Sequence, residues 1–209
     1  MSVHKIENTV YAGTSRAAAQ RVMILLHGRG ASAQSILPLA DALDLKDFAI
    51  IAPNATDGTW YPYSFMAPTA QNEPYLSSAL DLVKAICDQL LSSGFSTRQL
   101  HFAGFSQGAC LTAEFIGRHA AAYGGAFIFT GGLIGEHLEP TRYQGNFEGT
   151  PIFLGSADPD FHVPVERVYA TGNIFRDLGA TVTEKIYPGI GHTIIDDEIE
   201  IAQRILAVE

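Results

Sequence analysis

A serine at position 106 lies between two glycines in the run Gly104-Phe105-Ser106-Gln107-Gly108. This spacing fits the G-x-S-x-G nucleophile elbow, in which a strained turn between a strand and a helix lifts the serine Oγ above a sheet. The turn brings two backbones so close that a Cβ at Gly104 or Gly108 would collide with a neighbour. A serine presented in this way predicts acyl transfer through a covalent intermediate on Ser106.

The serine needs a base, and His192 is the candidate. A serine hydroxyl becomes a strong nucleophile only when a base takes its proton and a carboxylate holds that base in the correct tautomer. His192 ends the run Gly189-Ile190-Gly191-His192, directly after the last expected strand, 183–187. A histidine in this position fits the chain order serine, acid, histidine of α/β-hydrolase triads. A histidine base also predicts that the rate rises through about pH 6 to 8 and then levels.

The acid comes from the loop 156–164, where either of two aspartates could serve. Asp158 lies three residues after Gly155, and Asp160 lies four residues before Pro164. We expect the other aspartate to be a turn or cap residue. His162 in the same loop precedes a helix, so we interpret it as a supporting residue and not as the base.

The expected elements alternate between strands and helices and so predict a doubly wound, mostly parallel sheet without a separate lid domain. One α/β domain over residues 1–209 is expected from the length, and the nucleophile elbow is typical of the α/β-hydrolase fold. The active site of such a sheet lies at the carboxyl ends of its strands, where the glycine-rich loops fall. The expected strands are 3–12 (at an edge), 21–26, 48–52, 100–103, 126–130, 152–155 and 183–187, and the expected helices 33–43, 75–93, 107–119, 165–178 and 198–207.

Composition narrows the possible partners and the location. The net charge of -9, with 13 Lys and Arg that form no run, disfavours nucleic acid and anionic membranes. Neither a signal peptide nor an apolar stretch of about 18 residues is evident, which indicates a cytoplasmic protein without stable membrane insertion. Cys87 and Cys110 are expected to be reduced, buried thiols. No cofactor or metal is expected, because two carboxylates and one histidine in a five-residue loop make a poor tetrahedral site.

Taken together, the motifs resemble the phospholipase/carboxylesterase family, the bacterial relatives of acyl-protein thioesterases. The resemblance rests on the H-G-x-G run at His27, the elbow, the D-x-x-V-P run at Asp160 and the G-x-G-H run at His192, and it covers nearly the whole chain. It implies a triad of Ser106, Asp160 and His192. Asp158 stays open as the acid, because this chain has two more residues between glycine and acid than the family pattern.

The resemblance also implies an oxyanion hole made by the backbone N–H groups of Gln107 and Arg29. The family usually has an apolar residue where Arg29 stands. If the Arg29 side chain enters the cleft, it would favour an anionic or strongly polar acyl portion; if it points outward, only its N–H matters. His27 is expected to shape this loop and not to take part in catalysis.

The long segment 55–72 is rich in aromatic residues and lacks a regular period, and a loop of this length in a compact domain is usually functional. We expect Trp60, Tyr61 and Phe65 to wall the acyl or alcohol pocket, with simple packing as the alternative. Relatives carry a Trp, an aromatic and an Asp near here, whereas this chain reads Trp60-Tyr61-Pro62-Tyr63.

The expected function is therefore a serine carboxylesterase that hydrolyses small or medium carboxylic esters through an acyl-enzyme on Ser106. An acyl-protein thioesterase or lysophospholipase type of activity is an alternative. Dienelactone-hydrolase-like lactone opening is weaker, because its nucleophile is a cysteine. A binding protein on an inactive hydrolase fold is the non-enzymatic alternative. The sequence leaves the natural substrate and the oligomeric state, including a homodimer, open.

Overall fold

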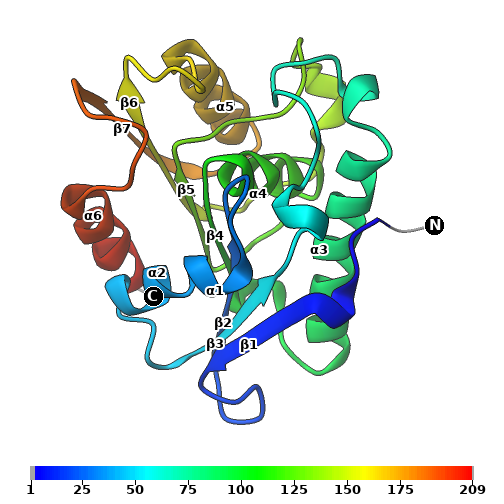
Figure 1. Cartoon of the computed structure of the whole chain (residues 1–209). Helices are drawn as coiled ribbons and strands as arrows, with labels where there is room; N and C mark the ends of the chain where they lie inside the picture. Colours follow the sequence, from blue (N-terminus) through cyan, green and yellow to red (C-terminus); the bar gives the residue numbers. More distant parts are fainter. Residues whose placement is uncertain (1–2, 209) are drawn as a thin grey trace.

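The computed structural model describes residues 3–208, and at its centre is a seven-stranded sheet of order β1-β3-β2-β4-β5-β6-β7 (Figure 1). Strand β1 pairs with β3 in the antiparallel direction, and all the other pairs are parallel. The α/β-hydrolase sheet predicted from the sequence is confirmed. Its strands are β1 (Thr9–Gly13), β2 (Arg21–Leu26), β3 (Phe48–Pro53), β4 (Leu100–Phe105), β5 (Gly125–Phe129), β6 (Pro151–Asp158) and β7 (Thr181–Pro188).

Helices cover both faces of this sheet, because its central strands are apolar on both sides. Side chains of α3, α4 and α5 pack into one core cluster, and those of α1, α2 and α6 pack into the other. The helices are α1 (Ala33–Ile36), α2 (Pro38–Ala42), α3 (Tyr75–Ser92), α4 (Gln107–Arg118), α5 (Val165–Asp177) and α6 (Asp196–Leu206). Short 3-10 turns are η1 (Ile6–Asn8), η2 (Thr56–Gly58), η3 (Thr69–Asn72), η4 (Thr97–Gln99) and η5 (Pro140–Arg142).

Three elements differ clearly from the expected ones. The edge strand expected over 3–12 is shorter, because Ile6–Asn8 form the turn η1 and only Thr9–Gly13 pairs with β3. The helix expected over 33–43 is broken into α1 and α2, because Pro38 has no N–H to continue the first helix and instead begins the second. Strand β6 is longer than the expected 152–155, since Ser156, Ala157 and Asp158 continue to pair with β7. Asp158 therefore belongs to a strand, whereas Asp160 lies in the turn beyond it.

The turn between β4 and α4 has the geometry expected of the nucleophile elbow. Ser106 has a φ of 55° and a ψ of −117°, a strained conformation for a residue with a side chain. A Cβ on Gly104 would lie 2.5 Å from the carbonyl of Gly108, and one on Gly108 would lie 2.0 Å from the carbonyl oxygen of Leu26. Glycine is therefore required at both positions.

Cys87 and Cys110 are free and buried, as predicted. Burial raises the pKa of both thiols to about 12, so both are protonated at neutral pH. Within residues 3–208, no helix is long and apolar enough to span a bilayer.

Candidate active site

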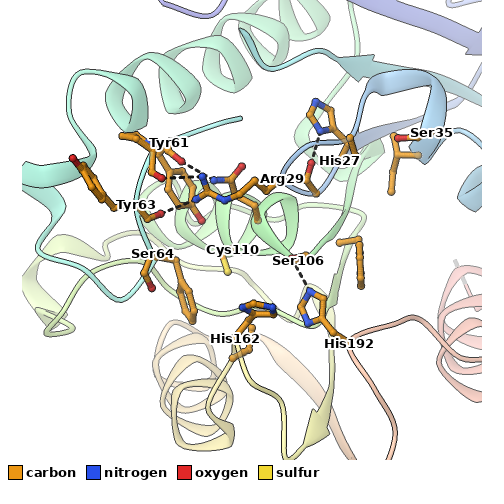
Figure 2. A pocket seen from close by; sticks show the side chains of 18 residues that line it. His27, Arg29, Ser35, Tyr61, Tyr63, Ser64, Ser106, Cys110, His162 and His192 are labelled. Atoms are coloured by element: carbon orange, nitrogen blue, oxygen red, sulfur yellow. Dashed lines mark hydrogen bonds between the residues drawn. The ribbon is translucent and has the colours of Figure 1, made fainter. Parts of the chain in front are cut away.

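The ends of three parallel strands bring Ser106, His192 and Asp160 together (Figure 2). The Ser106 Oγ lies 2.8 Å from His192 Nε2, and His192 Nδ1 lies 2.8 Å from Asp160 Oδ2. An ionised carboxylate only accepts hydrogen bonds, so Nδ1–H donates to Asp160. This leaves Nε2 without a proton and able to accept the hydroxyl proton of Ser106, which is the arrangement that activates a serine.

Both oxygens of the Asp160 carboxylate accept hydrogen bonds. The backbone N–H groups of His162 and Val163 donate to Oδ1 over 2.7 and 2.9 Å, while Oδ2 faces His192. Burial by itself would raise the pKa of Asp160, but the hydrogen bonds from His192 and the two N–H groups outweigh it and lower the pKa. Asp158 is exposed at the end of β6 and forms no hydrogen bond or ion pair with His192. Of the two candidate aspartates, only Asp160 is placed to orient the histidine.

The imidazole of His192 is held between two other rings. Its centroid lies 5.1 Å from that of Phe105 and 5.1 Å from that of His162. His162 makes no hydrogen bond with Ser106, so its place matches the supporting role expected from the sequence. Ring contacts of this kind restrict the rotation of His192 about its side-chain bonds.

Two backbone N–H groups at the elbow and the adjacent H-G-x-G loop have no hydrogen-bond partner among residues 3–208. Gln107 is the first residue of α4, where an N–H has no partner within the helix. The H-G-x-G loop passes beside the elbow, because a Cβ on Gly28 would lie 3.6 Å from the Ser106 Cβ. Among residues 3–208, no hydrogen bond uses the N–H of Gln107 or of Arg29. Both N–H groups therefore match the places expected for an oxyanion hole.

The side chain of Gln107 has a second task that sequence reasoning missed. Its Oε1 accepts from the N–H of Trp60 over 3.0 Å, and its Nε2 donates to the carbonyl of Tyr61 over 2.8 Å. The side chain is buried and fastens the aromatic loop to the elbow. A polar amide on the first turn of a helix that follows the nucleophile and is mostly buried is the signal that could have indicated this role.

His27 supports the H-G-x-G loop and has no contact with the serine, as expected. Its Nε2 accepts from the N–H of Ala55 over 3.1 Å, so its Nδ1 carries the proton and donates to the carbonyl of Gly28 over 2.7 Å. Burial lowers the pKa of His27 and keeps the ring neutral.

The expectation that Trp60 walls the pocket is wrong. Trp60 is fully buried behind the pocket, where its indole N–H donates to the carbonyl of His27 over 2.8 Å. A buried indole needs an acceptor for its single donor, and this carbonyl at the end of β2 supplies it. The neighbouring Tyr61 and, farther along the loop, Phe65 do line the pocket.

The pocket over Ser106 has a volume of about 740 Å³. Apolar groups of Phe65, Phe105 and Val163 form part of its lining. Arg29 also lines it, with its guanidinium bound to the carbonyl oxygens of Pro62 and Tyr63 over 2.9 and 2.7 Å. Arg29 is exposed, but these hydrogen bonds hold its side chain along the pocket wall.

No set of three or more His, Cys, Asp or Glu side chains within residues 3–208 is arranged to hold a metal ion. Asp160 and His162, which are neighbours in sequence, do not converge on one point, because the carboxylate of Asp160 is turned toward His192.

Glu198 lies at the start of α6 and fixes the loop that carries His192. Its Oε2 accepts from the N–H of Ile195 over 3.0 Å, whereas its Oε1 has no hydrogen-bond partner among residues 3–208. The side chain fits only because residue 155 is glycine, since a Cβ there would lie 2.0 Å from Oε1. Burial raises the pKa of Glu198 to about 7.

This raised pKa predicts a pH-dependent effect of Glu198→Gln on stability. A raised pKa in the folded state gives stability that is complete below the unfolded pKa and is lost as the pH rises through about 7. Glu198→Gln should therefore raise the free energy of unfolding at pH 8 by roughly 2 to 3 kcal/mol and change it little at pH 5. Urea titrations at the two pH values measure this difference, and an effect of equal size at both would contradict it.

Comparisons with known proteins agree with the family that the sequence motifs resemble. A model of the family described as Phospholipase/Carboxylesterase matches residues 8–208. A phospholipase/carboxylesterase from Dyadobacter fermentans, known from a crystal structure, has 44% sequence identity to this chain. The two structures align with a TM-score of 0.96 over 99% of each chain. The probable carboxylesterase SOBER1-like of Arabidopsis thaliana is 26% identical over 87% of this chain and 76% of its own length. Acyl-protein thioesterase 1 of Kluyveromyces lactis is 26% identical over 76% of this chain and 78% of its own length.

Proposed function

Because the chain belongs to the phospholipase/carboxylesterase family, we propose that it is a serine carboxylesterase that cleaves small or medium carboxylic esters. The hydrogen-bonded series from Ser106 through His192 to Asp160, at the wall of a 740 Å³ pocket, carries the proposal. A nucleophile, a base and an orienting carboxylate are the groups that acyl transfer requires.

In the acylation step, the Ser106 Oγ attacks the ester carbonyl carbon while His192 Nε2 takes the hydroxyl proton. The carbonyl oxygen becomes an oxyanion, which the N–H groups of Gln107 and Arg29 stabilise; one such donor is typically worth about 2.7 to 4 kcal/mol of barrier. The intermediate then expels the alcohol, and Nε2 gives its proton to the leaving oxygen. Asp160 stays ionised and stabilises the imidazolium between these two transfers.

Deacylation repeats the sequence with water. His192 Nε2 takes a proton from water as its oxygen attacks the acyl carbon, and then returns the proton to the Ser106 Oγ as the acid leaves. The same steps cleave a thioester, so an acyl-protein thioesterase activity uses the same residues. The similarity to acyl-protein thioesterase 1 keeps this second function in consideration. Parallel assays with an oxyester and a thioester of one acyl group distinguish the two.

Cys110 also lines the pocket, but it is a poor candidate for the nucleophile. Burial raises the pKa of its thiol to about 12, and a thiol reacts only as the thiolate. This favours Ser106 over a cysteine and weighs against dienelactone-type ring opening.

We also propose a cytoplasmic location, which the two free thiols support, since oxidising compartments favour disulfides. The single domain over residues 1–209 and a homodimer stay predictions.

The pH dependence of p-nitrophenyl acetate hydrolysis tests the role of a histidine base. Histidines generally titrate near ~6.5, and the base accepts a proton only when neutral, so kcat/KM should rise through about pH 6 to 8 and then level. Because the pKa of Asp160 is lowered, its carboxylate is lost only at pH values below this window, and the profile should have one acid limb there. A rate that increases tenfold per pH unit up to pH 10 would instead point to hydroxide as the nucleophile.

A further inference from the structure

The charge of the pocket lining is opposite to that of the whole protein. The chain has 22 acidic and 13 basic residues, yet no Asp or Glu is among the described residues that line the pocket. Arg29 is the one lining residue with a permanent charge. The carboxylate of Asp160 lies behind His192, and both of its oxygens already accept hydrogen bonds there. The permanent charge that a bound substrate meets on the described lining is therefore the positive charge of Arg29.

The Arg29 guanidinium is fixed in position but is not neutralised. Two carbonyls and, over 3.4 Å, the hydroxyl of Thr59 bind it, all of them neutral, and no Asp or Glu within residues 3–208 forms an ion pair with it. Arg98 and Arg118, by contrast, pair with Glu148 and Glu114. Figure 2 shows Arg29 across the pocket from His162, on the side of the aromatic loop.

One edge of this guanidinium is free to bind a ligand. Its Nη1 and Nη2 each donate to a loop carbonyl, whereas its Nε–H has no partner among residues 3–208. Nε–H and one hydrogen of Nη2 lie on the same edge of the planar group, and such an edge binds a carboxylate through two parallel hydrogen bonds. The carbonyls already hold the group in place, so little side-chain entropy is lost on binding.

We propose that Arg29 determines specificity by binding a carboxylate in the acyl portion of the substrate, so that the preferred substrates are half-esters of short dicarboxylic acids. The inference rests on the proposed function, because it concerns the substrate class of the same site. The apolar wall of Phe65 and Val163 takes the methylene chain between the scissile ester and the carboxylate.

The test compares two esters that differ only in charge: monoethyl glutarate, and the ethyl ester of glutaramic acid, in which an amide replaces the carboxylate. The wild-type protein should have a higher kcat/KM for the anionic ester. Arg29→Gln should lower the ratio of the two kcat/KM values by about tenfold or more, mainly through KM. The ratio in the wild-type protein should also fall as salt is added, because salt screens the charge.

Arg98→Gln is the matched control, because it removes the same charge from another exposed arginine that does not line the pocket, and it should leave the ratio unchanged. Arg29→Lys should restore part of the ratio, since it keeps the charge and loses the bidentate edge. A wild-type protein that does not prefer the anionic ester, or an Arg29→Gln variant that slows both esters equally, would overturn the inference. The second result would mean that Arg29 only anchors the aromatic loop.

Calorimetry with the Ser106→Ala protein separates this inference from the proposed function. Monoethyl glutarate should bind to it more tightly than the amide ester, and adding Arg29→Gln should remove the difference. If neither ester is hydrolysed by the wild-type protein, the proposed function fails, while the binding difference still decides the inference. If both esters are hydrolysed but bind equally, the inference fails and the proposed function stands.

Discussion

Ser106→Ala should lower kcat for p-nitrophenyl acetate by about 10⁴-fold or more. The Ser106 Oγ is the atom that forms the covalent bond, and it shares its proton with His192 across 2.8 Å. Removing one member of a unit of nucleophile and base costs nearly as much as removing the unit, because neither acts alone. The residual rate comes from binding and from the oxyanion hole. Steady-state kinetics with active-site titration of the wild-type protein measure the loss.

The comparison is valid only if the variant folds, so thermal unfolding of both proteins is the control. Alanine removes only the hydroxyl and meets the same backbone strain at a φ of 55°, so Tm should change by a few degrees at most. A folded Ser106→Ala protein that keeps a tenth of the wild-type rate would contradict the role of Ser106.

Asp160→Asn should be nearly as damaging, with a loss of roughly 10⁴ in kcat. The side-chain oxygen of asparagine can still accept from the N–H groups of His162 and Val163, which leaves its NH₂ group facing His192 Nδ1. That NH₂ group is a donor, so Nδ1 must become the acceptor and the ring proton moves to Nε2. A protonated Nε2 cannot take the proton of Ser106.

Asp158→Asn is the matched control, two residues away at the end of β6. Its side chain is exposed and forms no hydrogen bond or ion pair with His192, so kcat should change by less than about threefold. The reverse pattern, with a large loss in Asp158→Asn and a small one in Asp160→Asn, would transfer the acid role to Asp158.

The residues of the elbow could be read from the sequence because the motif that identifies them spans only five residues. Gly104 and Gly108 flank Ser106 within five residues, and the collisions that exclude other side chains there depend on this turn and on the adjoining strand β2. The strand and helix that bracket the turn follow from their own apolar patterns. Local patterns of this kind predicted most of the strands and helices and their order along the chain.

Two features could not be predicted because they depend on contacts between residues distant in sequence. One is which aspartate faces His192, and the other is which aromatic residues face the pocket. Asp160 is the residue that faces His192, 32 positions away, and the longer β6 that places Asp158 in the strand pairs with β7. Trp60 was expected to line the pocket, but its indole N–H donates to the carbonyl of His27, 33 positions away, and the ring lies behind the pocket wall. Arg29 lies along the wall because of carbonyls 33 and 34 positions away.

Covalent labelling with a fluorophosphonate tests the central claim most directly, because this reagent forms a stable adduct with a serine activated by a base. After digestion and mass spectrometry, the account predicts a single adduct on Ser106, formed in step with the loss of esterase activity and absent from Ser106→Ala. An adduct on another residue, or full activity with Ser106 labelled, would contradict the account.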